Sequence, residues 1–479
     1  MAVFLVGGAV RDALLGRSTH DHDFVLPAGA LAAGRQVASV LKAAYYPLDE
    51  ARQMARVVQI AQDGTREVLD FAVMRGPDLE SDLRARDFTI NAMAIDLRQP
   101  QALLDPLGGA ADLYAGQLRA CSSTTFSDDP VRILRGVRLA AEFGLHIQRD
   151  TLKNMRQAVG QLERVSVERM RDELFRILGG PQPSAALRAL DMIGALNFVL
   201  PEMSTLKGVQ QSPPHVNDVW THTLDVLRNL EALLNVLGPA YDPDVAASLS
   251  LGLVSLRLGR YRERLDAYLK TTITPERSLR SLLFLAALYH DAAKPLTRQL
   301  DEQGRVHFFE HAIVGAHLVG SRADALRLSN EESARLMVIV RHHMRPILLG
   351  QGEEPPTRRA IYRFFHDAGG AGVDICILSL ADILATYGPA LPQDVWQRHL
   401  AAVRLLLDAW FENPEQIVSP PMLLSGHDLI NELRLNPGEH IGRLLEAIRE
   451  AQATGQVNDR EGALALARSW LAEHKIDYG

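Results

Sequence analysis

The sequence is poor in cysteine and in aromatic residues. Only two of its 479 residues are cysteines, Cys121 and Cys376, which excludes a disulfide framework and a zinc site built from thiolates. A reducing, cytoplasmic location is therefore expected. Aromatic residues make up only 6%, and a composition rich in leucine, alanine and arginine favours a mostly helical body.

Long apolar runs and a uniformly basic surface are also missing. The run 282–288 is among the longest and is far too short to cross a bilayer, and MAVFLVGG lacks the charged start and cleavage site of a secretion signal. We expect no membrane or export role. The formal charge of -7 argues against a protein coated with basic residues, yet residues 119–188 carry twelve Lys and Arg against eight Asp and Glu.

Two adjacent glycines and two aspartates near the N-terminus predict a phosphate and metal site. An apolar strand over 3–6 runs into Gly7 and Gly8, where the backbone can approach a phosphate before a helix begins near residue 9. Asp21 and Asp23 are two residues apart on a second expected strand, so their carboxylates face the same side. Paired carboxylates repel each other unless a cation lies between them, which predicts Mg²⁺. A solvated turn is the ordinary alternative for an isolated Asp-x-Asp.

Two further segments of the first hundred residues carry polar groups that could join this site. After a helix expected over 30–44, strands over 54–61 and 67–71 place Asp70 among apolar neighbours, either paired with an arginine or turned toward the metals. In LRARDFTINAMAIDL (83–97), Arg86 could bind phosphate or ribose oxygens, and Asp87 and Asn91 could read a ribose hydroxyl. An ordinary helix cap explains the same residues.

The segment 128–144 predicts a helix with one polar ridge. Asp128 is a suitable N-cap, Pro130 suits the first turn and Gly144 is placed to end the helix. The ridge comes from four charged residues spaced by three, namely Asp129, Arg132, Arg135 and Arg138. A solvated face is the usual meaning of that spacing.

Four segments together resemble the class II tRNA nucleotidyltransferase and bacterial poly(A) polymerase family. They are GGAVRD, the Asp-x-Asp strand, RDFTINAMA and DDPVRILRGVRLAAEFG, in that family's order. The resemblance implies a polymerase-beta-like head that transfers a nucleotide with two Mg²⁺ ions, which activate the tRNA 3'-hydroxyl against the α-phosphate of CTP. It implies metal ligands at Asp21 and Asp23, and a third acid at Asp70. It implies nucleotide contacts at Gly7, Gly8, Arg11, Arg86, Asp87, Asn91, Asp129, Arg132, Arg135 and Arg138.

In this family the motif around Asp129 and Arg132 acts as a template for the incoming base. Cytosine and adenine each offer an amino donor beside a ring-nitrogen acceptor, so Asp accepts and Arg donates. Uracil reverses both groups, and a buried mispair of that kind costs a few kcal/mol. The helix expected over 164–178 from Ser166 belongs to the neck. Basic residues of the neck are the candidates for tRNA backbone contacts: Lys153, Arg156, Arg169 and Arg171.

The middle of the chain carries an ordered series of histidines and aspartates, namely His222, the pair His290-Asp291 and Asp382. This series resembles the HD superfamily of metal-dependent phosphohydrolases. The resemblance rests on four ordered positions and implies a divalent transition metal or Mg²⁺ on His222, His290, Asp291 and Asp382. His311 and His343 could hold a second metal, and Lys294 could steady a phosphate. Relatives of this kind hydrolyse phosphoesters, including 2',3'-cyclic phosphates. A helical spacer with satisfied histidines is the alternative.

The fold class that follows is α+β, with a mixed-sheet head and all-helical parts after it. The expected divisions are a catalytic head over 1–118, a neck over 119–212, an HD domain over 213–390 and a C-terminal helical body over 391–479. In the last part we interpret His427-Asp428 as a helix cap rather than a metal site.

Only fifteen residues separate Asp70 from Arg86, where family members that add a whole CCA usually carry a longer flexible loop. The hypothesis is therefore a CC-adding enzyme that takes CTP, with a separate protein adding the terminal A; full CCA addition with CTP and ATP stays possible. One alternative is a poly(A) polymerase that extends any RNA. Another is a phosphohydrolase whose N-terminal part only senses nucleotides.

Overall fold

The computed structural model describes residues 2–61, 64–239 and 248–474. The chain divides into two compact units, Met1–Val199 and Leu200–Gly479.

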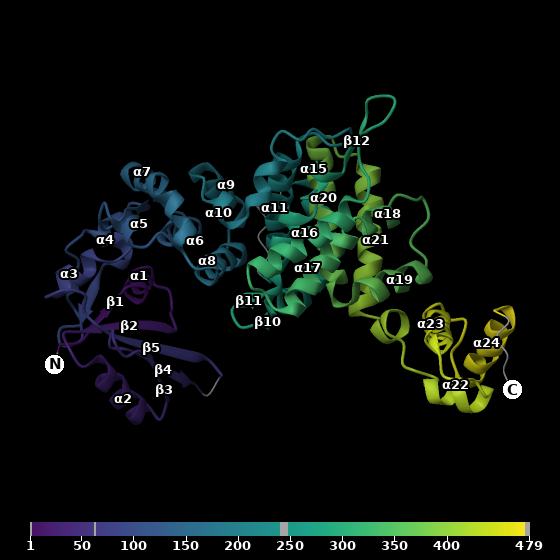
Figure 1. Cartoon of the computed structure of the whole chain (residues 1–479), viewed down its shortest axis with the longest axis horizontal. Helices are drawn as coiled ribbons and strands as arrows, with labels where there is room; N and C mark the ends of the chain where they lie inside the picture. Colours follow the sequence, from purple (N-terminus) through teal and green to yellow (C-terminus); the bar gives the residue numbers. More distant parts are fainter. Residues whose placement is uncertain (1, 62–63, 240–247, 475–479) are drawn as a thin grey trace. The chain divides into compact units, whose positions relative to one another are not determined.

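The first unit is built on a mixed sheet, which confirms the expected fold class (Figure 1). In the described residues the sheet has seven strands in the order β3-β4-β5-β2-β1-β6-β7. The strands are β1 Phe4–Val6, β2 Asp21–Leu26, β3 Ala44–Asp49, β4 Met54–Ile60, β5 Arg66–Val73, β6 Ala94–Asp96 and β7 Leu103–Leu104. Strands β2 and β5 run parallel, while β2 is antiparallel to β1 on its other side.

Each face of this sheet carries its own hydrophobic core. Val25 packs with Val6 and Leu83 on one face, and its neighbour Leu26 packs with Ala30 of helix α2 (Ala30–Leu41) on the other. Adjacent residues of a strand point to opposite faces, so β2 contributes to both cores. The same alternation places Asp21 and Asp23 on the face of Val25.

Two expected helices of the first unit begin or end elsewhere than predicted. The helix expected over 30–44 ends at Leu41, because Lys42 is left-handed and Ala44 already begins the edge strand β3. The helix expected from Asp128 is split into α5 Thr125–Asp128 and α6 Arg132–Phe143. Asp129 between them is extended, as expected for a residue that precedes a proline. The predicted end at Gly144 is confirmed.

The remaining helices of the first unit position the site from either side. They are α1 Gly8–Leu14, α3 Leu79–Arg84, α4 Gly109–Tyr114, α7 Arg149–Ala158, α8 Val167–Gly179, α9 Pro183–Ile193 and α10 Leu196–Val199. Helix α8 begins after Ser166, as predicted. A Cβ at Gly136 would lie 2.4 Å from Met155 Cε and 2.7 Å from a ring atom of Phe88, so only glycine lets α6 lie this close.

The second unit is helical, as expected. Five helices converge on its central cluster of polar residues: α11 Val219–Val236, α14 Leu279–Tyr289, α16 His311–Ala325, α17 Asn330–His342 and α20 Gly372–Tyr387. Around them lie α12 Leu249–Leu258, α13 Arg262–Lys270, α15 Lys294–Thr297, α18 Arg345–Leu349, α19 Arg358–Ala368 and α21 Gln393–Phe411. The hairpins β10 Thr272–Thr274/β11 Arg277–Ser278 and β12 Arg298–Leu300/β13 Val306–Phe308 join these helices (Figure 1).

Three C-terminal helices share a hydrophobic core of their own. They are α22 Gly426–Leu433, α23 Glu439–Ala453 and α24 Arg460–Glu473. Ser425 and Asp428 form a reciprocal capping box at the start of α22, which confirms that His427-Asp428 belongs to a helix cap.

One helical stretch, Arg358–Ala390, is long and apolar enough to cross a membrane by length and composition. Of its most apolar window, 83% is buried inside the second unit, which is the environment of a core helix.

Candidate functional site

Asp21 and Asp23 lie on one face of β2, as predicted, and the next strand adds a third carboxylate. The parallel register of β2 and β5 places Asp70 directly opposite Asp23. Burial raises the pKa of Asp23 above its usual value; Arg86 counteracts this, and the negative charges of Asp70 and Asp21 reinforce it. A carboxylate destabilised in this way is a suitable ligand for a divalent cation.

Asp70 takes the first of the two roles that the sequence left open, since it is paired with an arginine. Arg56 on β4 donates from Nε to Asp70 Oδ1 and from Nη2 to Oδ2, both at 2.8 Å. This bidentate pair fixes the carboxylate beside Asp23 and compensates part of its charge.

The glycine turn brings the backbone against the acidic residues. Gly7 has φ +77°, and a Cβ there would lie 3.1 Å from Asp23 Oδ2 and 3.2 Å from Arg86 Nη1. Nearby, Arg11 donates from Nη1 to Asn91 Oδ1 at 2.7 Å, and its guanidinium lies 4.2 Å above the ring of Phe143. Residues far apart in the sequence are thus held around one cationic and acidic centre.

The segment after α3 is fixed by two buried carboxylates. Asp82 is 2% exposed and accepts from Arg86 Nε at 3.2 Å. Asp87 accepts from Asn91 Nδ2 and lies 3.3 Å from Arg135 Nη1. Burial acts to raise the pKa of Asp87, but Arg135 and these hydrogen bonds hold it below its usual range.

These groups line one open pocket of about 310 Å³. Its walls are formed by Gly7, Gly8, Arg11, Asp12, Thr19, Asp21, Asp23, Arg86, Asp87, Asn91, Arg135, Arg138, Leu139 and Arg176. The structure therefore brings together ten of the residues singled out from the sequence for metal or nucleotide binding. Acidic and cationic groups in one pocket can hold a triphosphate together with its counter-ions.

Asp129 and Arg132 are not among the pocket's lining residues. Arg132 is 9% exposed and donates to the carbonyls of Ala85 and Thr125. Its Nε lies 3.9 Å from Asp129 Oδ2, and that oxygen accepts a 2.7 Å bond from Arg169 Nη2. The carboxylate's other oxygen, Oδ1, is buried and has no hydrogen-bond partner among the described residues.

Glu173 of α8 binds two of the arginines that line the pocket, and it was not predicted from the sequence. It is 3% exposed and accepts from Arg135 Nε at 3.0 Å and from Arg138 Nε at 2.8 Å. Burial acts to raise the pKa of Glu173, but Arg138 and Arg135 hold it below its usual value. The available signal was an acidic residue on the apolar face of an amphipathic helix.

The basic residues of the neck fall into two groups. Lys153 and Arg156 line a basic hollow on α7 with Arg149. Arg169 binds Asp129, and Arg171 is 15% exposed with its Nη2 2.8 Å from Asp172. The exposed cations of α7 are the group best placed for a phosphate backbone.

The second unit contains a buried cluster built around Asp291. His222, His290 and Asp291 place ligand atoms within 4.8 Å of one another, and so do Asp291, His311 and His343. The two triads share Asp291, whose Oδ2 lies 3.2 Å from His290 Nε2 and whose Oδ1 lies 3.4 Å from His311 Nε2. Asp382 joins through Oδ1, 3.1 Å from His222 Nε2.

Local backbone contacts prepare three of these histidines as ligands. Nδ1 of His290, His311 and His343 lies 2.6–2.8 Å from the carbonyl three residues earlier, so each ring donates there and turns Nε2 toward Asp291. Nε2 of His311 and His343 is buried and makes no hydrogen bond within the described residues, although Asp291 Oδ1 lies 3.4 and 4.0 Å away. Burial lowers the pKa of His343 to about 4, so it is neutral. Nε2 atoms that lack a hydrogen bond and lie beside a carboxylate fit a divalent metal.

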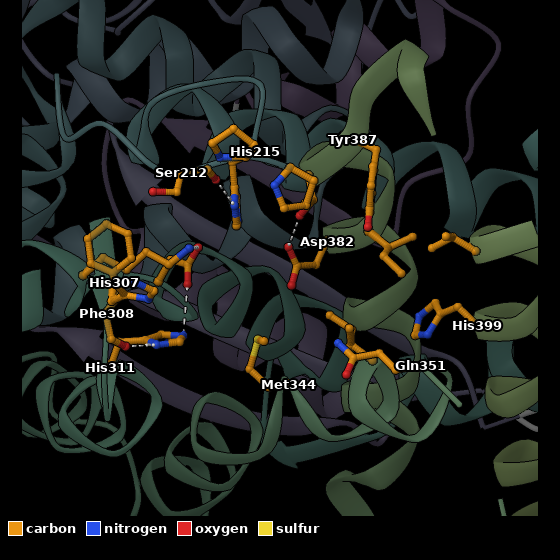
Figure 2. Close-up of a pocket in the computed structure, with 18 of the residues that line it drawn as sticks. Ser212, His215, His307, Phe308, His311, Met344, Gln351, Asp382, Tyr387 and His399 are labelled. Carbon is orange, nitrogen blue, oxygen red and sulfur yellow. Dashed lines mark hydrogen bonds and ion pairs between the residues drawn. The ribbon is translucent and has the colours of Figure 1, made fainter. Parts of the chain in front are cut away.

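A pocket of about 540 Å³ opens beside this cluster (Figure 2). Its lining includes Asp291, Asp382 and His311, and it also includes His215, which sequence reasoning missed. Burial lowers the pKa of His215 to about 4. Lys294 Nζ lies 2.6 Å from Asp291 Oδ2, so the positive charge of Lys294 is paired with the Asp291 carboxylate.

Comparison with known proteins agrees with both resemblances. Residues 3–119 match the family described as the poly A polymerase head domain, 144–206 the probable RNA and SrmB-binding site of polymerase A, and 219–386 the HD domain. The chain is 32% identical to an A-adding tRNA nucleotidyltransferase of Deinococcus radiodurans, over 98% of this chain and 95% of that protein. It is also 32% identical to a CC-adding tRNA nucleotidyltransferase of Thermus thermophilus, over 98% and 93%.

A solved structure is similar along most of both chains. The CCA-adding enzyme of Thermotoga maritima in complex with tRNA has a TM-score of 0.58 and 21% identity, covering 98% of this chain and 91% of that one. At this identity the similarity establishes the fold.

Proposed function

The chain belongs to the tRNA nucleotidyltransferase and poly(A) polymerase family, and from that membership we propose that it adds CMP from CTP to immature tRNA 3' ends. The coarser activity, nucleotide transfer to the tRNA 3' end, follows from relatives that match nearly the whole chain. The observation that carries the proposal is the 310 Å³ pocket, which joins Asp21 and Asp23 to Arg11, Arg86 and Asn91.

In the proposed reaction the tRNA 3'-hydroxyl forms a bond to the α-phosphorus of CTP, and pyrophosphate leaves. Two Mg²⁺ ions held by Asp21 and Asp23 would supply activation of the hydroxyl and charge compensation at the phosphates. Asp70 orients the acidic face, while Arg11, Arg135 and Arg138 bind the triphosphate. Arg86, Asp87 and Asn91 hold the ribose and its phosphate, and Asp129 with Arg132 reads the base.

The addition of CC alone is supported by the short connection after β5. Strand β5 ends at Val73 and α3 begins at Leu79, which leaves residues 74–78. Asp78 caps α3, and the Arg75 N–H donates to the buried Asp82. These contacts leave little free chain for a loop that could remodel the pocket between cytidine and adenosine. A separate A-adding enzyme would then complete the tRNA.

The decisive experiment supplies each nucleotide alone, and CTP plus ATP, to tRNA lacking its CCA end, to tRNA ending in CC and to an unstructured RNA, then sequences the products. The proposal predicts products ending in CC in both CTP reactions. Products ending in CCA contradict the CC-only specificity, and addition of a single A to tRNA ending in CC identifies an A-adding enzyme instead. Long adenylate tails on an unstructured RNA identify a poly(A) polymerase.

We propose a second activity, metal-dependent phosphoester hydrolysis, at the cluster of the second unit. His222, His290, Asp291 and Asp382 would hold one divalent metal, and His311 and His343 with Asp291 a second. Bound metals would supply an acidic water and polarise a phosphoryl group. Lys294 steadies the phosphate from beside Asp291. The expected substrates include RNA ends with 2',3'-cyclic phosphates.

The test measures hydrolysis of a 2',3'-cyclic-phosphate RNA end with Mn²⁺, Ni²⁺ or Mg²⁺ after chelator treatment. Asp291→Asn should abolish hydrolysis and leave CMP addition intact. Asp23→Asn should do the reverse, because the acidic face of the head is then incomplete. Loss of hydrolysis in Asp23→Asn contradicts two independent sites and favours a phosphohydrolase with a nucleotide-sensing head.

We also propose that the chain has four parts, with divisions after residues 118, 212 and 390.

A further inference from the structure

Arg169 contacts a residue assigned to base reading, although the sequence suggested an RNA contact for it. Its Nη2 donates to Asp129 Oδ2 at 2.7 Å, from α8 to the extended residue between α5 and α6. The arginine side chain is 52% exposed and the aspartate 24%, so one end of the pair reaches solvent and the other lies against the protein.

The second oxygen of the Asp129 carboxylate makes no hydrogen bond within the described part of the chain. Asp129 Oδ1 is buried and has no hydrogen-bond partner among the described residues. A buried acceptor without a donor is costly, and such groups are normally satisfied by water or a ligand. The Asp129 side chain cannot rotate freely to bring Oδ1 to a donor, because Arg169 holds Oδ2. The backbone of Asp129 is also constrained, since it is extended ahead of Pro130.

The neighbouring arginine of the template does not supply that donor. Arg132 Nε lies 3.9 Å from Asp129 Oδ2, and its Nη atoms donate to the carbonyls of Ala85, Arg86 and Thr125. Arg169 is therefore the group in hydrogen-bond contact with the Asp129 carboxylate among the described side chains. This bond fixes the orientation of the carboxylate, whose oxygens accept hydrogen bonds.

We propose that Arg169 is a positioning residue that sets base specificity by fixing Asp129 as an acceptor with Oδ1 free for the amino group of the base. This rests on the proposed template role of Asp129. Cytosine and adenine present an amino donor, whereas uracil and guanine present a carbonyl acceptor at that position. An oriented carboxylate accepts from the first pair and repels the second. A carboxylate free to rotate discriminates less.

The experiment compares kcat/KM for CTP and for UTP in wild type and Arg169→Ala, on the same tRNA. The proposal predicts that the CTP:UTP ratio falls by about tenfold, the equivalent of one charge-assisted hydrogen bond. Arg169→Lys should restore most of the ratio, and Arg169→Gln, which keeps donors without the charge, should not. An unchanged ratio in both Ala and Gln variants overturns the proposal.

A double-mutant cycle separates positioning from general structural support. If Arg169 acts through the carboxylate, then Arg169→Ala should change the ratio no further in an Asp129→Asn background. Additive losses in the double variant overturn the proposal. Arg188→Ala, which removes an exposed arginine of α9 in the same unit, is the control and should keep the wild-type ratio.

The tRNA dependence distinguishes this role from binding of the RNA backbone. The proposal predicts that Arg169→Ala leaves KM for tRNA within about twofold of wild type, on the scale of an exposed charge. A raised KM for tRNA with an unchanged CTP:UTP ratio assigns Arg169 to RNA binding and overturns the proposal. Should the enzyme add A rather than C, the same variants are measured with ATP against GTP. Failure of CC addition is thus seen separately from failure of this inference.

Discussion

Asp70 lies opposite Asp23 across the β2–β5 pair, and Arg56 holds both of its oxygens. The arginine thereby lowers the negative charge that a metal must compensate at the head. Arg56→Met should destabilise the metal-free head by about 1 kcal/mol, the scale of a partly exposed pair, and make its melting temperature rise more when Mg²⁺ is added.

The measurement is thermal unfolding followed by circular dichroism at several Mg²⁺ concentrations. Arg66→Met removes an exposed arginine at the start of β5, the strand that carries Asp70, and serves as the control. Equal Mg²⁺ dependence in the two variants would contradict a coupling between Arg56 and the acidic face.

Glu173→Gln should weaken triphosphate binding. The carboxylate accepts hydrogen bonds from Arg138 and Arg135 at once. A glutamine has a single acceptor oxygen, so one arginine loses its hydrogen bond. We expect KM for CTP to rise about tenfold with a smaller change in kcat, as for loss of binding shared by ground and transition states.

Steady-state kinetics with saturating tRNA tests this expectation. Glu142→Gln is the matched control, because Glu142 also binds Arg138 but is 37% exposed. A similar KM increase in both variants would argue against a special role for the buried acid.

Glu332 is a buried acid that links stability to pH. Its side chain is 0% exposed and accepts from Thr274 and Arg277, while the capping box with Ser329 starts α17. Although burial acts to raise it, the pKa of Glu332 is lowered to about 2 by these donors. A lowered folded-state pKa stabilises the protein above the unfolded value near 4.5, and that stabilisation is lost as the pH falls toward 2.

Glu332→Gln should therefore cost about 3 kcal/mol at pH 7 and make stability less dependent on pH between 4.5 and 2. All four tryptophans lie beyond residue 199, so tryptophan fluorescence in urea follows the second unit alone. Glu331→Gln, one residue earlier and exposed, should unfold like wild type. Parallel pH profiles for wild type and Glu332→Gln would refute the assignment.

The shared aspartate predicts the metal content of the second unit. Asp291 belongs to both triads, whereas His343 belongs to one. Asp291→Asn should remove all metal bound by the second unit, and His343→Gln should remove half, because the first triad stays complete. Elemental analysis after reconstitution with Mn²⁺ counts the ions. Full occupancy in His343→Gln would mean that this histidine holds no metal.

The sequence predicted features that depend on near neighbours. Asp21 and Asp23 share a face because strand residues alternate, and Gly144 ends α6 because its conformation suits glycine. The start of α6 was wrong because the effect of Pro130 on Asp129 outweighed the capping signal at Asp128. Strand β3 was missed because it is an edge strand that contains Pro47.

Partners from distant parts of the chain could not be predicted. Arg56 holds Asp70, Glu173 binds Arg135 and Arg138 of α6, and Arg169 binds Asp129. Periodicity says which face of a helix or strand is polar, but not which distant group meets it after packing. A solvated charge and an ion-paired one have the same sequence pattern.

The position of β2 between two strands makes the chemistry of the head sensitive to its folding. Hydrogen bonding to β1 on one side and β5 on the other fixes the register of Asp23 against Val6 and Asp70. A slip by one residue would turn both aspartates toward α2 and expose the apolar side chains that belong there. Catalytic activity therefore also reports on strand alignment. A substitution deep in the sheet can abolish activity although the substituted residue makes no contact with a nucleotide.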